Sequence, residues 1–244
     1  MKDILSMDYR EIAVRYDLGP LKVGGDFTLT PTGDLEMTVD GDIKLGDSRH
    51  NALHRLVVSW QMEGPLLASM FNAVLGSEEK KRDYKAMIDA LVSRRDLDAE
   101  SIEEFHRLQE AIGVNQMGSG NAAGAIAVAL NNMLRREWFD LGKPATWDRA
   151  GDKIAGHSFG SVVEAMSNNY RHADEWARHD PPTRQQLESI RVIADVLGTS
   201  LPPDGARHPF RGNICPKVIL AISGGSFETL ADGFFGFGRV LAGL

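Results

Sequence analysis

The sequence lacks several features that are common in secreted and membrane proteins. It has a single cysteine, Cys215, among 244 residues, which excludes an internal disulfide and suits a reducing compartment. No stretch reaches the ~18 consecutive apolar residues that a membrane-spanning helix needs. The first residues also lack the apolar core of a secretory signal peptide. We therefore expect a soluble, cytoplasmic protein with no membrane partner.

Positive charge is also scarce. Lys and Arg number 27 against 34 Asp and Glu, which gives a formal net charge of −7. A surface with this balance does not attract nucleic acid as a whole, so binding to RNA would require a local basic patch. Hydrophobic residues make up 43% of the chain, which is enough for an ordinary globular core.

Hydrophobic periodicity divides the chain into a short β region and a long helical region. Residues 10–45 contain four short runs rich in alternating or β-branched residues: IAVRYDL, DFTLT, LEMTV and DIKL. Gly-Asp turns separate the last three runs. After Asp47, apolar residues recur at helical spacing. The predicted fold is therefore mainly α, of the α+β type, with an antiparallel β meander at residues 1–47 packed on a multi-helix domain at residues 48–244.

Two features predict where helices end, and a third concerns the role of the C-terminal segment. Gly64-Pro65 is expected to break or kink the first helix, because proline removes a donor and clashes one turn back. Gly113 is expected to end a later helix. The C-terminal segment contains Phe234, Phe235 and Phe237. This segment is either the last core helix or a surface for self-association or for a protein partner.

The segment from Gly156 to His179 is predicted to form one amphipathic helix with an unusual polar face. Apolar residues recur three and four apart along one side, whereas Asn168, Arg171, His172 and Glu175 fall on the other. These groups can form hydrogen bonds and move protons. As a catalytic site, His172 would be the acid/base, Arg171 would bind an anion, and Glu175 or Asn168 would orient a partner. The alternative is a structural polar seam between helices.

A second polar cluster lies at the start of the first predicted helix, where four residues separate Arg49 from His54. This R-x4-H pattern resembles the active-site motif of HEPN ribonucleases, small helical proteins of bacterial toxin and defence systems. Residues 169–176 are similar to an N-Y-[RK]-H-x-x-E-W signature of bacterial helical proteins allied to that fold. The resemblance implies a metal-independent ribonuclease that needs no cofactor. A histidine would serve as acid/base at the RNA 2′-hydroxyl or leaving oxygen, and an arginine would neutralise the phosphate. Alternatively, residues 49–54 have no catalytic role and are the solvent-exposed first turn of the predicted helix.

Residues 156–160, GHSFG, fit the G-x-S-x-G nucleophile elbow, for which a triad of Ser158, Asp195 and His208 can be written. That motif requires a strand leading into a sharp turn above a parallel sheet. The preceding residues, DRAGDKIA, make a poor buried strand, so a chance match is the alternative.

Residues 25–60 combine repeated Gly-Asp turns with a following helix. In this they resemble the small baseplate-wedge proteins of contractile phage tails. That resemblance implies a protein without enzymatic activity, which assembles or binds a partner in a phage or prophage. Such a protein should expose an apolar patch and self-associate.

Overall fold

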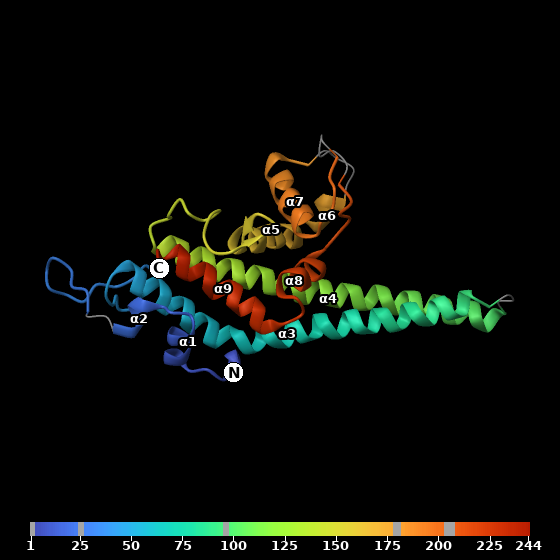
Figure 1. Cartoon of the computed structure of the whole chain (residues 1–244), viewed down its shortest axis with the longest axis horizontal. Coiled ribbons are helices and arrows are strands. Elements are labelled where there is room, and N and C mark those ends of the chain that lie inside the picture. The colour runs from blue at the N-terminus through green and yellow to red at the C-terminus, as the bar shows by residue number, and fades with distance from the viewer. Residues whose placement is uncertain (1–2, 24–26, 95–97, 178–181, 203–207) are drawn as a thin grey trace.

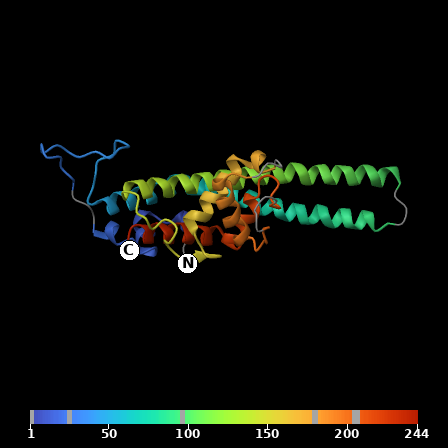
Figure 2. The same ribbon diagram turned by 90° about the horizontal axis from the view of Figure 1, so that it is seen from above.

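The computed structural model describes residues 3–23, 27–94, 98–177, 182–202 and 208–244, and the fold is mainly helical (Figure 1). Its dominant feature is a hairpin of two long helices, α3 (Ser48–Val92) and α4 (Ala99–Asp140). Figures 1 and 2 show the outer half of this hairpin projecting as an arm, while the other helices gather around the inner half. Within the described residues, regular β structure is confined to one antiparallel pair, β1 (Lys153–Ile154) and β2 (His157–Ser158).

The chain begins with helices in a region where the sequence predicted β structure. They are η1 (Ile4–Ser6), α1 (Tyr9–Arg15) and α2 (Gly19–Val23). The strand predicted at IAVRYDL, residues 12–18, is therefore wrong. α1 begins at a capping box, in which the Asp8 carboxylate accepts from the Glu11 N–H and the Glu11 carboxylate accepts from the Asp8 N–H. Ile12 and Ala13 are then buried in the core as one face of this helix.

α3 runs without interruption through Gly64 and Pro65, so the break predicted there is wrong. A proline inside a helix costs about 3 kcal/mol relative to alanine. On either side of it, however, Trp60 and Phe71 are fully buried in the core. Continuing the helix keeps both rings in place, so tertiary packing outweighs the local loss.

α4 is also continuous, and Gly113 does not end it. Two later glycines allow close packing instead. A Cβ atom at Gly124 would lie 2.0 Å from Cδ2 of Tyr170, and one at Gly120 would lie 3.0 Å from Nδ2 of Asn213. Because Gly124 has no side chain, the Tyr170 ring of α5 (Phe159–Arg171) lies directly against the backbone of α4.

The central helix predicted at residues 156–179 begins later and divides in two. The Ser158 hydroxyl accepts from the Ser161 N–H, so α5 begins at Phe159. A break at His172 separates α5 from α6 (Ala173–Ala177), and residues 178–179 lie outside the described part of the chain. Ser158 is buried and donates to the Trp147 carbonyl, while Asp195 bonds to His157. The nucleophile elbow and its triad are therefore not formed.

Three further helices complete the body: α7 (Arg184–Val196), α8 (Cys215–Ser223) and α9 (Phe227–Leu241). Phe234, Phe235 and Phe237 of α9 are buried, and the first two pack on the ring of Trp60. These phenylalanines therefore belong to the core. Among the described helices, none is by itself long and apolar enough to cross a membrane; α8 and α9 pass that test only as a pair, which bends by 83°.

The N-terminal β meander is not confirmed as a sheet. Residues 27–46 instead form what we call the three-lobed segment, which is held by isolated antiparallel bridges. The bridges join Phe27 to Leu45, Leu29 to Leu35, and Met37 to Ile43. Thr28, Glu36 and Lys44, each eight residues from the next, close a triangle of backbone hydrogen bonds. These run from Thr28 N to Lys44 O (3.0 Å), from Glu36 N to Thr28 O (2.8 Å) and from Lys44 N to Glu36 O (2.8 Å).

Candidate functional site

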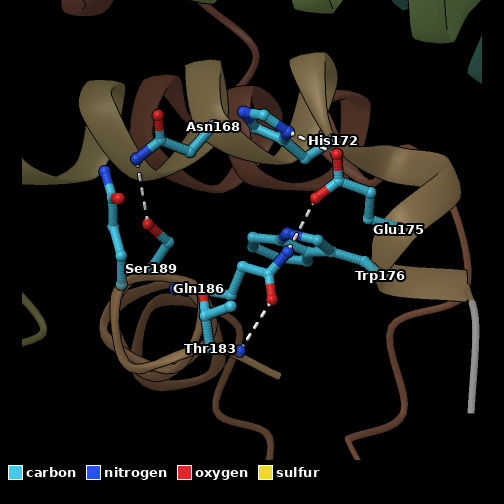
Figure 3. A pocket seen from close by; sticks show the side chains of 8 residues that line it. Asn168, His172, Glu175, Trp176, Thr183, Gln186 and Ser189 are labelled. Carbon is cyan, nitrogen blue, oxygen red and sulfur yellow. Dashed lines mark hydrogen bonds and ion pairs between the residues drawn. The ribbon is translucent and has the colours of Figure 1, made fainter. Parts of the chain in front are cut away.

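Most of the polar stripe predicted from the sequence lines a cavity between α5, α6 and α7 (Figure 3). The cavity has a volume of about 160 Å³. Three of the four predicted residues, Asn168, His172 and Glu175, lie in its wall. The wall also contains Trp176, which belongs to the signature at residues 169–176, and four residues that the sequence did not indicate as part of a site: Thr183, Gln185, Gln186 and Ser189.

A chain of hydrogen bonds links the start of α7 to the imidazole of His172. Thr183 and Gln186 form the capping box of α7, in which Gln186 Oε1 accepts from the Thr183 N–H at 2.8 Å. Gln186 Nε2 donates to Glu175 Oε2 at 2.9 Å, and Glu175 Oε1 lies 3.0 Å from His172 Nδ1. Because an ionised carboxylate only accepts, this contact favours the tautomer with the proton on Nδ1. Nε2 of His172 is then a proton acceptor.

The opposite side of the cavity is closed by a second cross-helix contact. Asn168 Nδ2 donates to Ser189 Oγ at 3.1 Å, which ties α5 to α7. The indole of Trp176 lies between these two contacts (Figure 3) and is 2% exposed. Its Nε1 has no hydrogen-bond partner among the described residues. The cavity therefore combines an oriented imidazole with a buried aromatic wall.

The remaining residue of the predicted stripe, Arg171, lies outside this arrangement. It is exposed at the end of α5, and no Lys or Arg is among the described residues that line the cavity. The cavity can therefore orient a base, but within its described wall only a protonated His172 would carry positive charge. This differs from the predicted site, in which an arginine beside the histidine binds the anion.

The alternative pair, Arg49 and His54, does not form a joint site within the chain. Five positions along a helix turn two side chains about 140° apart. The Arg49 guanidinium pairs with Asp47 at 3.1 Å, whereas His54 Nδ1 lies 2.9 Å from the Tyr9 hydroxyl. Burial, and then the neighbouring His50, lower the pKa of His54. Figure 1 shows the start of α3 and α6 in separate parts of the molecule, so the two predicted clusters do not meet.

Two further observations concern a possible metal site and the similarity of this chain to known proteins. Among the described residues, no three His, Cys, Asp or Glu side chains gather as metal ligands would. Comparison with models of protein families, with curated proteins and with solved structures finds no match to this chain.

A second candidate site is the uncovered side of the three-lobed segment. Bridged residues place their side chains on the same side, as do residues two apart in a strand. One side, which we call the apolar face, therefore carries Phe27, Leu29, Leu35, Met37, Ile43 and Leu45. The first five of these are 62, 57, 46, 51 and 43% exposed. The side chains of the intervening Glu36 and Lys44 are 37 and 32% exposed, so the segment exposes its apolar side chains at least as much as the polar ones between them.

Polar contacts from the helices hold the three-lobed segment in place. The Arg55 guanidinium of α3 bonds to Thr38 Oγ1 at 3.0 Å and pairs with Asp40 and with Asp140 of α4. The Asn51 side chain bonds to the backbone of Leu45. Burial raises the pKa of Asp140, although Arg55 acts in the opposite direction. Because these contacts use polar groups, attaching the segment leaves its apolar face exposed.

Proposed function

We propose that this protein is a non-enzymatic assembly protein that docks onto another protein through the apolar face. The observation that carries the proposal is the exposure of five large apolar side chains on one side of the three-lobed segment. Scattered exposed apolar residues are ordinary, but contiguous patches of several hundred Å² mark interaction surfaces. The segment also protrudes from the helical body (Figures 1 and 2), which makes the face accessible.

The size of the apolar face fits such a role. At roughly half exposure each, five of its six side chains leave on the order of 500 Å² of apolar surface in water. Covering that surface is worth on the order of 10 kcal/mol before the entropic costs of association are subtracted. A docked partner would therefore gain a substantial driving force from this face alone.

Site-specific photo-crosslinking in the producing cells tests the proposal. A benzophenone amino acid replaces Met37 on the apolar face in one variant. In the matched control it replaces Met62 of α3, which is also exposed, at 78% against 51% for Met37. We expect a discrete crosslinked adduct from position 37 and none from position 62, because only the first lies against a partner.

The two positions also define the result that would contradict the proposal. If position 37 gives no adduct, or if both positions give the same smear of products, the face is not a specific interface. An adduct of twice the monomer mass would identify the partner as a second copy, and any other mass would indicate a different protein.

A metal-independent ribonuclease of the HEPN type is the second candidate function. It is favoured by one observation, the Glu175 contact that orients the His172 imidazole at the wall of a cavity. In that mechanism His172 would take the proton of the RNA 2′-hydroxyl, and Arg171 would approach the phosphate from outside the cavity. General acid–base catalysis of this kind typically contributes 10²–10⁴-fold to a rate.

Cleavage of labelled single-stranded RNA in EDTA tests this second function. We expect the wild type to cleave in chelator and His172→Ala to lose at least about 100-fold in rate. His106→Ala, which removes an exposed histidine of the arm, should cleave like the wild type. An inactive wild type, or complete inhibition by EDTA, would rule this mechanism out.

A further inference from the structure

We infer that residues 238–241, the last turn of α9, form a pH-sensitive switch, which stays packed while the Glu137 carboxyl group is protonated and detaches when that group ionises. Three helices meet at this turn. A Cβ atom at Gly238 of α9 would lie 2.6 Å from Cδ2 of Leu56 on α3 and 2.8 Å from Oε2 of Glu137 on α4. Because not even a methyl group fits there, no water molecule lies between the carboxyl group and α9. An ionised Glu137 therefore cannot be hydrated from this side while the turn stays packed.

The charged groups around Glu137 offer it no counterion. Neither carboxyl oxygen has a hydrogen-bond partner among the described residues. The cations on the helices that meet here are paired with other carboxylates: Arg55 with Asp40 and Asp140, Arg136 with Asp40, and Arg239 with Asp17. Burial, and then the negative charge of Asp140 three residues further along α4, raise the pKa of Glu137 from 4.5 to about 8. Ionisation thus leaves a buried charge that gains most from contact with water.

The end of α9 is the part of this contact that can yield. Phe237 packs against the Trp147 ring, with the ring centroids 5.1 Å apart, which holds the helix up to that point. Glycine residues flank Phe237 on both sides, and glycine weakens a helix interior. Beyond them, the ion pair of Arg239 with Asp17 is long, at 3.5 Å, and largely exposed, so it adds little stability. Leu241 is buried at 4% exposure, which keeps the turn packed while Glu137 is neutral.

The direction of the pH effect follows from proton binding. In the packed form the carboxyl group keeps its proton up to about pH 8, whereas in the detached form its pKa returns toward the ordinary 4.5. Between these two values the detached form binds fewer protons, so the ratio of detached to packed molecules should rise about tenfold per pH unit. Above about pH 8 both forms are ionised and the ratio levels off.

Hydrogen exchange of the full-length protein between pH 5.5 and 9, resolved for single amides and corrected for the intrinsic rate at each pH, tests the inference. The reporter is the Ala242 amide, which donates to the Gly238 carbonyl at 3.0 Å. We expect its protection to fall about tenfold per pH unit up to pH 8 and then to level off. In Glu137→Gln the protection should not change with pH. Glu110→Gln, which removes an exposed carboxyl group of the same helix, should behave like the wild type.

Low concentrations of urea separate a local opening from global unfolding, because a local opening exposes little surface and responds weakly to urea. Reporter exchange that increases with urea as steeply as the slowest core amides would overturn the switch. A wild-type protection that is constant with pH, or a Glu137→Gln variant that keeps the pH dependence, would do the same. Should that variant not fold, the ¹³C signal of the Glu137 carboxyl group in the wild type decides: we expect a titration midpoint well above pH 5, and a midpoint below it contradicts the inference.

Discussion

Replacing Glu137 by glutamine is expected to remove a large pH dependence of stability. Glu137 lies on α4 at 2% exposure, and neither carboxyl oxygen has a hydrogen-bond partner among the described residues. A Cβ at Gly238 of α9 would lie 2.8 Å from Oε2, so the backbone of α9 covers the group. Burial, and then the nearby Asp140, raise the pKa of Glu137 from 4.5 to about 8. The native protein therefore holds this carboxyl group in its neutral form at pH 7.

The sign of the effect follows from proton binding. Between pH 4.5 and 8 the unfolded chain releases the Glu137 proton, while the native protein keeps it. The native state then binds more protons, so the free energy of unfolding falls as the pH rises through this window. Each unit of difference in pKa is worth roughly 1.4 kcal/mol, which gives a total on the order of 4 kcal/mol. Glutamine cannot ionise and loses nothing over the same range.

Urea unfolding of wild type and Glu137→Gln at pH 5.5, 6.5, 7.5 and 8.5 measures this difference. We expect the stability of the variant relative to the wild type to increase steadily with pH and to level off above pH 8. Glu63→Gln, at an exposed position of α3, is the control and should follow the wild-type curve. Parallel curves for wild type and Glu137→Gln would show that the Glu137 carboxyl is ionised in the native protein.

The second large effect is expected from Gly124→Ala, which places one methyl group 2.0 Å from Cδ2 of Tyr170. Both residues lie on packed helices, so α5 must move away from α4 or the Tyr170 ring must leave its position. Overpacking of this kind costs about 1–3 kcal/mol, and occasionally more. Because Tyr170 lies between Asn168 and His172 in sequence, we also expect the cavity wall to shift.

A second glycine of the same helix provides the control. A Cβ at Gly118 would meet nothing within 4 Å, so Gly118→Ala should stabilise the protein by up to about 1 kcal/mol through helix propensity alone. Thermal or urea unfolding of the two variants should therefore change stability in opposite directions. If Gly124→Ala is also stabilising, the close approach of α5 to α4 is not as described.

Local sequence signals predicted only part of the cavity. Asn168, His172 and Glu175 are spaced by four and three residues, so helical periodicity predicts that they share one face, and they line one cavity although Glu175 lies on α6, beyond the break at His172. The capping pattern of Thr183 and Gln186 is also visible in the sequence. The sequence does not reveal that α7 packs on α5, and that packing brings Gln186 to Glu175 and Ser189 to Asn168. The break of the helix at His172 was also not predicted.

The helix boundaries were also only partly predictable from local sequence signals. The cap at Asp47 is a local hydrogen bond, and the sequence placed this helix start correctly. Gly64-Pro65 and Gly113 are also local signals, but α3 and α4 continue through them. The burial of Trp60 and Phe71 keeps α3 helical through Pro65. Local preferences differ by only a few kcal/mol, which the burial of large side chains readily exceeds.

The sequence by itself determined that this protein is mainly helical, where several of its helices begin and that Asn168, His172 and Glu175 lie close together. These properties depend on interactions within one or two turns of the chain. Only the tertiary structure decided that Glu137 is buried, that the C-terminal phenylalanines belong to the core and that the apolar face of residues 27–45 remains in water. Alternation along a strand shows that two faces differ, but which face is covered depends on the helices that bind the segment, here through Arg55 and Asn51.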